Sequence, residues 1–228
     1  AVDDLDIANM VVAVAAGNEG DGDPEANPPL APGHFTVASP GSAARALDLV
    51  QATGERDLAV IGCGAIGLTT AVTAQRAGLR VRIYARERPP DVSSSFATGV
   101  WTPDSRVCSA AAATPDFERQ WEALARTSFR VYQTLLGLPG APVEWHEGYA
   151  LSDVPFGPGA GRKAEGEPEY AALESRLLGD LRPVPQALAA GEHPFAAPYA
   201  ARYSRLGFNI GALSRLLMDD FGEGRRRV

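Results

Sequence analysis

The chain has 228 residues, of which 45% are apolar and 21% charged, and its formal net charge is −7. This composition is typical of a soluble globular protein, and a chain of this length can bury a substantial core. The acidic balance argues against a nucleic-acid partner, and no apolar run is long enough to span a membrane.

The cysteines and histidines predict neither a disulfide scaffold nor a metal site. Cys63 and Cys108 match no zinc spacing, so a reduced, cytoplasmic setting is expected. The acidic N-terminus also lacks the basic start of a secretory signal. The three histidines show no ligand spacing, and they are His34, His146 and His193.

The first 56 residues predict one strand followed mainly by loop. Residues 10–16 are continuously apolar and indicate a buried strand. Residues 17–33 are rich in Gly, Pro and acidic residues and predict a loop. A short strand and a helical turn are expected within 34–50, and 51–56 reads as a linker.

A strand, a glycine turn, a helix and a second strand are predicted for 57–87. The first strand is expected at 57–62, the helix at 65–78 with Gly78 as its stop, and the second strand at 79–85. The predicted buried face of the helix consists of Ile66, Ala71, Ala74 and Ala77. The alternating apolar residues of the second strand are Val81, Ile83 and Ala85.

Gly62, Gly64 and Gly67 form a G-x-G-x-x-G pattern in the context that dinucleotide binding requires. The first glycine allows a tight turn, the second a close approach to pyrophosphate, and the third close packing of helix and strand. Glu87 has the offset of a ribose ligand. The alternative is a glycine turn that only connects strand and helix, and these residues do not distinguish FAD from a nicotinamide cofactor.

The remaining chain predicts a mixture of helix, strand and loop. A loop is expected at 89–103, and 114–137 reads as a long amphipathic helix with acidic residues in its first turn. Its apolar positions are Phe117, Trp121, Leu124 and Phe129. Residues 143–153 predict strand, turn and strand, 155–168 a loop, and 208–224 a strand end followed by a helix.

Several of these stretches resemble the D-amino-acid oxidase family. The glycine turn is followed by a hydroxyl-rich stretch at 93–95 and then by Gly-Val-Trp-Thr-Pro at 99–103. "WHEGYALSD" and "FNIGALSRLLMDDF" are also similar to that family, and the resemblance covers about 57–228. It implies an α/β fold, with a Rossmann-like FAD-binding βαβ start, an inserted α+β portion of a substrate domain and an incomplete C-terminal part.

The resemblance also implies FAD as the cofactor and assigns roles along the chain. The glycine turn would hold the pyrophosphate, Arg86 and Glu87 would lie by the adenosine ribose, and Ser93 and Ser94 would offer hydroxyls to the phosphates. Thr98, Gly99 and Val100 would run beside the flavin. The implied cofactor-binding residues are Gly62, Gly64, Ala65, Ile66, Gly67, Arg86, Glu87, Ser93, Ser94, Thr98, Gly99 and Val100.

The implied reaction is the oxidative deamination of a D-amino acid to a keto acid, ammonia and hydrogen peroxide. The family's carboxylate-binding Arg and tyrosines would lie beyond residue 228, so no catalytic residue is assigned. Four tyrosines are interpreted as packing or surface residues: Tyr149, Tyr170, Tyr199 and Tyr203. With only two strands expected in the sheet, one sheet edge would be open and the chain a poor folder or weak FAD binder. Alternatives are a glycine or sarcosine oxidase, a non-catalytic FAD-binding fragment or an inert fusion product.

Residues 11–47 resemble a piece of the subtilisin-like serine proteases. In that family the Asn of an Ala-Gly-Asn-Glu-Gly turn serves the oxyanion hole, and Asn18 has that position. No nucleophile turn follows, so a peptidase fragment is the least favoured function. The expected domains are therefore 1–50 as this fragment, 51–56 as a linker and 57–228 as the oxidase-like part. The junction between the two parts is interpreted as a fusion remnant, a mis-joined gene model or an assembly of fragmentary sequence.

Overall fold

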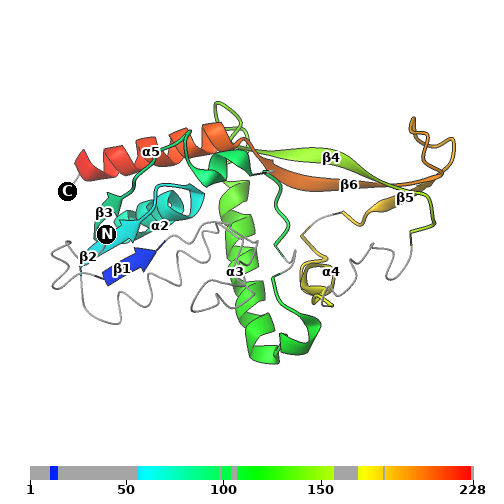
Figure 1. Cartoon of the computed structure of the whole chain (residues 1–228), viewed down its shortest axis with the longest axis horizontal. Coiled ribbons are helices and arrows are strands. Elements are labelled where there is room, and N and C mark those ends of the chain that lie inside the picture. Colours follow the sequence, from blue (N-terminus) through cyan, green and yellow to red (C-terminus); the bar gives the residue numbers. More distant parts are fainter. Residues whose placement is uncertain are drawn as a thin grey trace. The chain divides into compact units, whose positions relative to one another are not determined.

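The computed structural model describes residues 11–14, 56–97, 99–103, 107–156, 169–181 and 183–226. Contacts divide them into two compact units. The first unit holds the described residues of 1–99, 123–143 and 209–228, and the second holds those of 100–122 and 144–208. The strands, the two 3-10 turns and the helices of both units are drawn in chain-order colours in Figure 1.

The elements follow one another in a mixed α and β order. In the first unit they are β1 (Val11–Val14), β2 (Asp57–Ile61), α2 (Ala65–Arg76), β3 (Arg80–Tyr84), η1 (Ser93–Phe96) and α5 (Ile210–Arg226). In the second they are η2 (Ala110–Ala112), β4 (Val143–Ser152), α4 (Leu173–Leu177), β5 (Gln186–Ala189) and β6 (Tyr199–Phe208), with β4 beginning at the unit boundary. Helix α3 (Pro115–Gln133) contributes residues to both units.

The sheet of the first unit has three parallel strands in the order β1-β2-β3. Strands β2 and β3 confirm the two strands predicted around the glycine turn, and β1 confirms the strand predicted within 10–16. The expectation that the sheet has only two strands is wrong, because β1 pairs with β2 along the edge opposite β3. The predicted features between 15 and 55 lie outside the described residues.

Strand β2 is buried on both of its faces. Leu58, Ala59 and Val60 are successive residues with exposed fractions of 2%, 0% and 0%. Because successive side chains of a strand point to opposite faces, burial of all three requires cover on both sides of the sheet. On one face the core consists of Leu58, Val60, Ala71, Ala74, Leu79 and Val81, with Ile83 and Phe221 packed against it.

Helix α2 begins and ends close to the predicted residues. Gly78 has a φ of +86°, which glycine adopts readily, and this residue follows the end of the helix as expected. The predicted buried face is correct at Ala71 and Ala74, but Ala77 and the strand residue Ala85 are exposed because each lies beyond the end of its element. Leu68 and Val72 complete the buried face.

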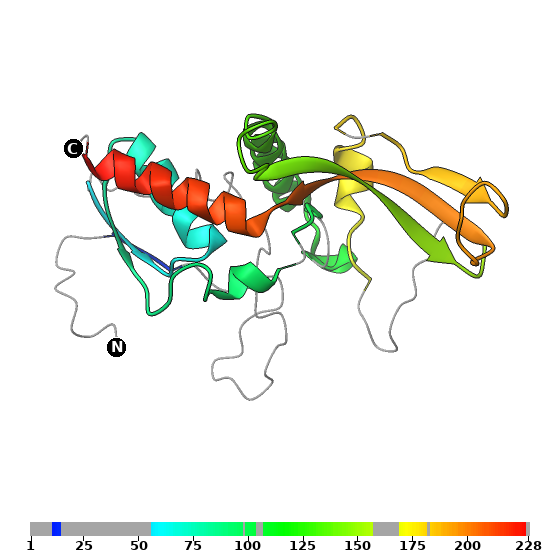
Figure 2. The ribbon, with the colours of Figure 1, turned by 90° about the horizontal axis from the view of Figure 1, so that it is seen from above.

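Helix α5 packs against α2, and Figure 2 shows the two helices of this unit from above. The Arg76 guanidinium lies 2.8 Å from the Asp220 carboxylate and links the two helices. Phe221 of α5 reaches the core formed by β2, α2 and β3. The C-terminal helix is therefore part of the same packed unit as the glycine turn, although it is distant in sequence.

The sheet of the second unit has the order β4-β6-β5. The prediction of strand, turn and strand for 143–153 is wrong, because β4 is one continuous strand. A Cβ on Gly148 would lie 2.8 Å from ring atoms of Tyr203, so this glycine accommodates a neighbouring ring instead of making a turn. Strand β5 pairs with β6 in antiparallel fashion, and Val100 bridges to Gly207.

The core of the second unit includes buried tryptophans on a loop and on α3. Trp101 is 5% exposed, and its backbone N–H donates to the Leu206 carbonyl at 2.9 Å. Trp121 is 3% exposed, and its indole N–H donates to the Pro103 carbonyl at 3.1 Å. Both hydrogen bonds show that residues 101–103 are held by packing within this unit.

Replacing Leu58 tests the importance of the buried β2 strand. We expect Leu58→Ala to lower the free energy of unfolding by about 2–5 kcal/mol, because the cavity forms where the side chain is 2% exposed. Urea unfolding should be followed by far-UV circular dichroism, since all three tryptophans lie in the second unit. Phe96→Ala, at an 86% exposed residue, is the control and should change stability by less than about 0.5 kcal/mol. Equal effects of both substitutions would contradict the core assignment.

Candidate cofactor site

The glycine turn leaves the carboxyl end of β2 through a backbone conformation that favours glycine. Gly62 has a φ of +106°, where a residue with a Cβ would be strained. Its backbone N–H donates to the Tyr84 carbonyl at 2.8 Å, which ties the turn to the end of β3. Sequence reasoning missed the role of Tyr84, although the equal lengths of the two parallel strands place Ile61 opposite Tyr84.

Ser94 lies directly over the second glycine of the turn. A Cβ on Gly64 would approach the Ser94 Oγ to 2.8 Å, closer than normal packing permits. The Ala65 backbone N–H donates to the same Oγ at 3.0 Å. Gly64 has no side chain to cap α2, so the serine hydroxyl, 29 positions away in sequence, acts as the cap.

The start of α2 offers further hydrogen-bond donors and a favourable field for an anion. The first-turn amides of Ile66 and Gly67 have no carbonyl four residues earlier within the helix, whereas the Leu68 N–H donates to the Gly64 carbonyl at 2.9 Å. No acidic residue lies in the first turn. The partial positive charge of the helix start is therefore not neutralised by a carboxylate of that turn.

Arg86 and Glu87 follow the end of β3 and pair with each other. The Glu87 Oε1 accepts from the Arg86 Nε at 3.0 Å and from its Nη2 at 2.7 Å. The two side chains are 90% and 47% exposed, respectively. This exposed pair contributes little to stability. The other oxygen of the Glu87 carboxylate, Oε2, could accept a hydrogen bond from a hydroxyl group.

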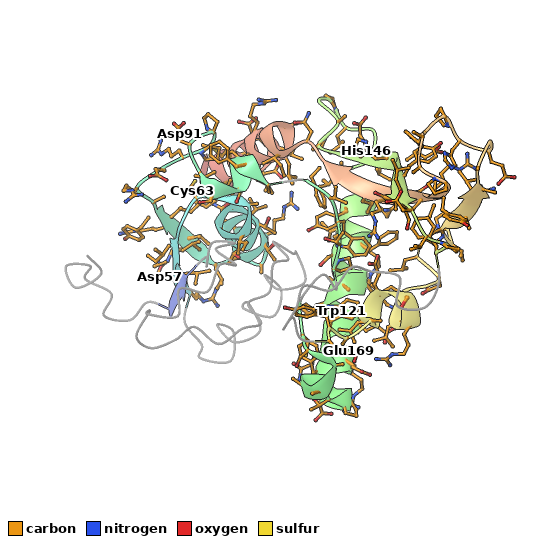
Figure 3. The ribbon with its side chains drawn as sticks, turned by 45° about the vertical axis from the view of Figure 1, so that its right-hand side comes forward. Asp57, Cys63, Asp91, Trp121, His146 and Glu169 are labelled. Carbon is orange, nitrogen blue, oxygen red and sulfur yellow. The ribbon has the colours of Figure 1, made fainter. Side chains whose placement is uncertain are left out.

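Cys63 lies inside the glycine turn and is 8% exposed. Figure 3 shows it near the carboxyl end of β2, with Asp57 at the opposite end of the strand. Burial raises the pKa of the Cys63 thiol, and the positive charge of Arg88 opposes this only in part. The thiol is therefore kept protonated and acts as a small apolar group in the turn.

The structure brings together some of the predicted site residues and not others. Gly62, Gly64, Ala65 and Ser94 meet at the turn, Ile66 and Gly67 follow in α2, and the exposed Ser93 lies next to Ser94 in η1. Gly99 has a φ of +65° in the first unit, while Val100 belongs to the second. Thr98, Asn18 and His34 lie outside the described residues.

The described residues contain neither a metal-ligating cluster nor a membrane-spanning helix. Within them, no group of three or more His, Cys, Asp or Glu side chains could hold a metal ion. His193 stacks on Phe195 with ring centroids 5.8 Å apart. None of the helices in the described part of the chain is both long and apolar enough to cross a membrane.

Removing the Ser94 hydroxyl should loosen the start of α2. We expect Ser94→Ala to lower the free energy of unfolding by about 1 kcal/mol, because the Ala65 N–H loses its acceptor. Urea unfolding in the absence of any cofactor measures this effect. Ser95→Ala, in the same 3-10 turn, is the matched control and should be close to neutral. An Ser94→Ala variant as stable as wild type would contradict the capping role.

The buried thiol of Cys63 should react slowly with alkylating reagents. Its raised pKa lowers the thiolate fraction at pH 8, and burial restricts access, so we expect alkylation by iodoacetamide at least about tenfold slower than in urea-unfolded chain. The rate should rise with pH as the thiol deprotonates. Mass spectrometry of the Cys63 peptide, in a Cys108→Ser background, measures it. Equal rates in folded and unfolded chain would contradict the burial of this turn.

The glycine turn and the elements around it lie in a stretch that matches a known protein family. Residues 57–213 match the model of the FAD dependent oxidoreductase family. The chain is 38% identical over 77 residues to a D-amino-acid oxidase of Rubrobacter xylanophilus, covering 32% of this chain and 24% of that protein. It is 40% identical over 88 residues to a D-amino-acid oxidase of Streptomyces coelicolor, covering 38% of this chain and 25% of that protein.

These matches cover only about a quarter of the length of the curated relatives. The family match itself spans more than half of the chain, and it includes β2, the glycine turn, α2, β3 and η1. The Rossmann-like strand, turn, helix and strand are the part of this family that holds FAD. The chain belongs to the FAD dependent oxidoreductase family.

Proposed function

We propose that this chain is the FAD-binding part of an oxidase that acts on D-amino acids. The observation that carries the proposal is the position of Ser94 over Gly64, where the serine hydroxyl accepts a hydrogen bond from the first residue of α2. The names of the two relatives support the choice of D-amino acids as the substrate class. The proposed oxidase-type domain is 57–228, preceded by the proposed linker at 51–56 and by the segment 1–50, whose strand β1 joins the sheet of the first unit.

The residues of the turn fit a pyrophosphate. The amides of Ile66 and Gly67 are donors at the positive end of α2, and the missing side chain of Gly64 lets the Ser94 hydroxyl lie against the start of that helix. Ser94 accepts a hydrogen bond from Ala65, so its own hydroxyl proton is available to donate to a phosphate oxygen. This arrangement supports a donor role for Ser94 toward the cofactor.

The ribose and flavin contacts follow from the remaining predicted residues. Glu87 would accept from a ribose hydroxyl with the carboxylate oxygen that does not bind Arg86. Ser93 would add a second hydroxyl to the phosphates, while Thr98, Gly99 and Val100 would offer backbone groups beside the flavin. FAD, when bound, accepts the α-hydrogen and two electrons of the amino acid.

The overall reaction of the proposed oxidase is balanced by dioxygen and water. The D-amino acid loses two electrons and two protons to become an imino acid, and dioxygen takes them up to form hydrogen peroxide. Water then adds to the imine, and the keto acid and ammonia separate. Binding of the substrate carboxylate requires a positively charged group, for which a bidentate Arg is best suited.

The decisive experiment is an absorption spectrum followed by substrate addition. The purified 228-residue chain is incubated with FAD, desalted and scanned for bound flavin, and D-alanine or L-alanine is then added without oxygen. Bleaching of bound flavin by D-alanine alone supports the proposed oxidase. Bound flavin that neither amino acid bleaches would favour a non-catalytic FAD-binding chain. A chain that retains no flavin would overturn the assignment of the glycine turn.

A methyl group at Gly64 should weaken FAD binding. We expect Gly64→Ala to raise the Kd for FAD by at least about tenfold, because the added Cβ competes with the Ser94 hydroxyl and closes the approach to the turn. Quenching of flavin fluorescence on titration measures the Kd. Gly222→Ala in α5 is the matched control, since a Cβ there meets open space. Unchanged binding by Gly64→Ala would argue that the turn does not contact the cofactor.

A further inference from the structure

Strand β1 lies outside the range that matches the family, yet it belongs to the sheet that carries the glycine turn. The family match begins at residue 57, whereas β1 is Val11–Val14. Its four residues pair in parallel with Leu58, Ala59, Val60 and Ile61. Figure 1 shows β1 beside β2, on the side away from β3.

Strand β1 lies at a position that another strand occupies in a doubly wound sheet. In the strand order 3-2-1-4-5-6, the first strand has the second on one side and the fourth on the other. Strands β2 and β3 correspond to the first and second strands, because the glycine turn and α2 connect them. Strand β1 therefore occupies the place of the fourth strand, which in that order comes from sequence after β3.

The edge of β2 that faces away from β3 lies among apolar residues. Leu58, Ala59 and Val60 are each at most 2% exposed, so both faces of β2 are covered. A bare β2 edge would present a row of unpaired N–H and C=O groups next to apolar residues. Without another strand there, this edge would be open to pairing with other chains.

We propose that residues 11–14 form an edge strand that pairs with the free edge of β2. They would take the position that the fourth strand holds in the doubly wound order. Residues 11–14 then contribute to the folded unit that carries the glycine turn. Val14 pairs with Ile61, the residue before Gly62, so the added strand also supports the strand end from which the glycine turn leaves. The inference depends on strand pairing alone and stands apart from the proposed flavin chemistry.

Two proline substitutions in the full chain test the pairing. In an edge strand, successive residues direct their N–H groups alternately toward and away from the neighbouring strand. One of Val12→Pro and Ala13→Pro therefore removes a hydrogen bond to β2, while the other loses an outward N–H and is tolerated. Each variant is the matched control of the other.

Hydrogen–deuterium exchange of the β2 amides, without FAD, provides the measurement. We expect one variant to raise exchange in 57–61 by at least about tenfold and the other to leave it unchanged. Exchange in β6 of the second unit serves as the internal reference. In variants that keep the far-UV circular dichroism of wild type, equal exchange of the β2 amides, whether raised or unchanged, overturns the proposal.

A measurement on the unmodified chain covers the case in which a proline variant does not fold. Interstrand nuclear Overhauser contacts between backbone protons should follow the register Val12↔Ala59 and Ala13↔Val60. Their observation supports the proposal. Their absence, or contacts from 58–61 to some other segment along the same edge, shows that β1 does not occupy this place.

Discussion

The first unit depends on the burial of β2 on both of its faces. Leu58 and Val60 pack on the side of α2, and Ala59 is equally buried on the opposite side. This burial fixes the direction and position of the strand, and the glycine turn leaves from its carboxyl end. The turn is then held by the bond from the Gly62 N–H to the Tyr84 carbonyl. The position of the start of α2 follows from these two constraints.

The candidate site joins two requirements that a single residue could not meet. The start of α2 needs a cap, and the proposed pyrophosphate needs open backbone donors at the same point. A side chain at Gly64 would collide with the Ser94 Oγ. Ser94 supplies the capping oxygen from a different segment. The lack of a side chain at Gly64 and the presence of a hydroxyl at Ser94 are therefore parts of one arrangement.

Membership of the FAD dependent oxidoreductase family identifies FAD as the cofactor. The turn, α2 and η1 all lie in the matched range, while β1 lies before it. The two relatives named as D-amino-acid oxidases support the proposed substrate class. The family match includes the glycine turn, and β1 pairs with β2 at the edge opposite β3.

The sequence by itself determined the local elements around the site. The apolar run at 57–62, the glycine spacing and the stop at Gly78 predicted β2, the turn and α2, because these depend on neighbouring residues and backbone conformation. The resemblance named Gly64 and Ser94 as cofactor residues, and the predicted roles of both remain to be tested. Tertiary structure alone decided that the Ser94 Oγ meets the Ala65 N–H, since the two groups are 29 positions apart. It also decided that Gly148 makes room for Tyr203 within a continuous strand, and that β1 joins β2, because strand pairing and side-chain contacts between distant segments leave no pattern in local sequence.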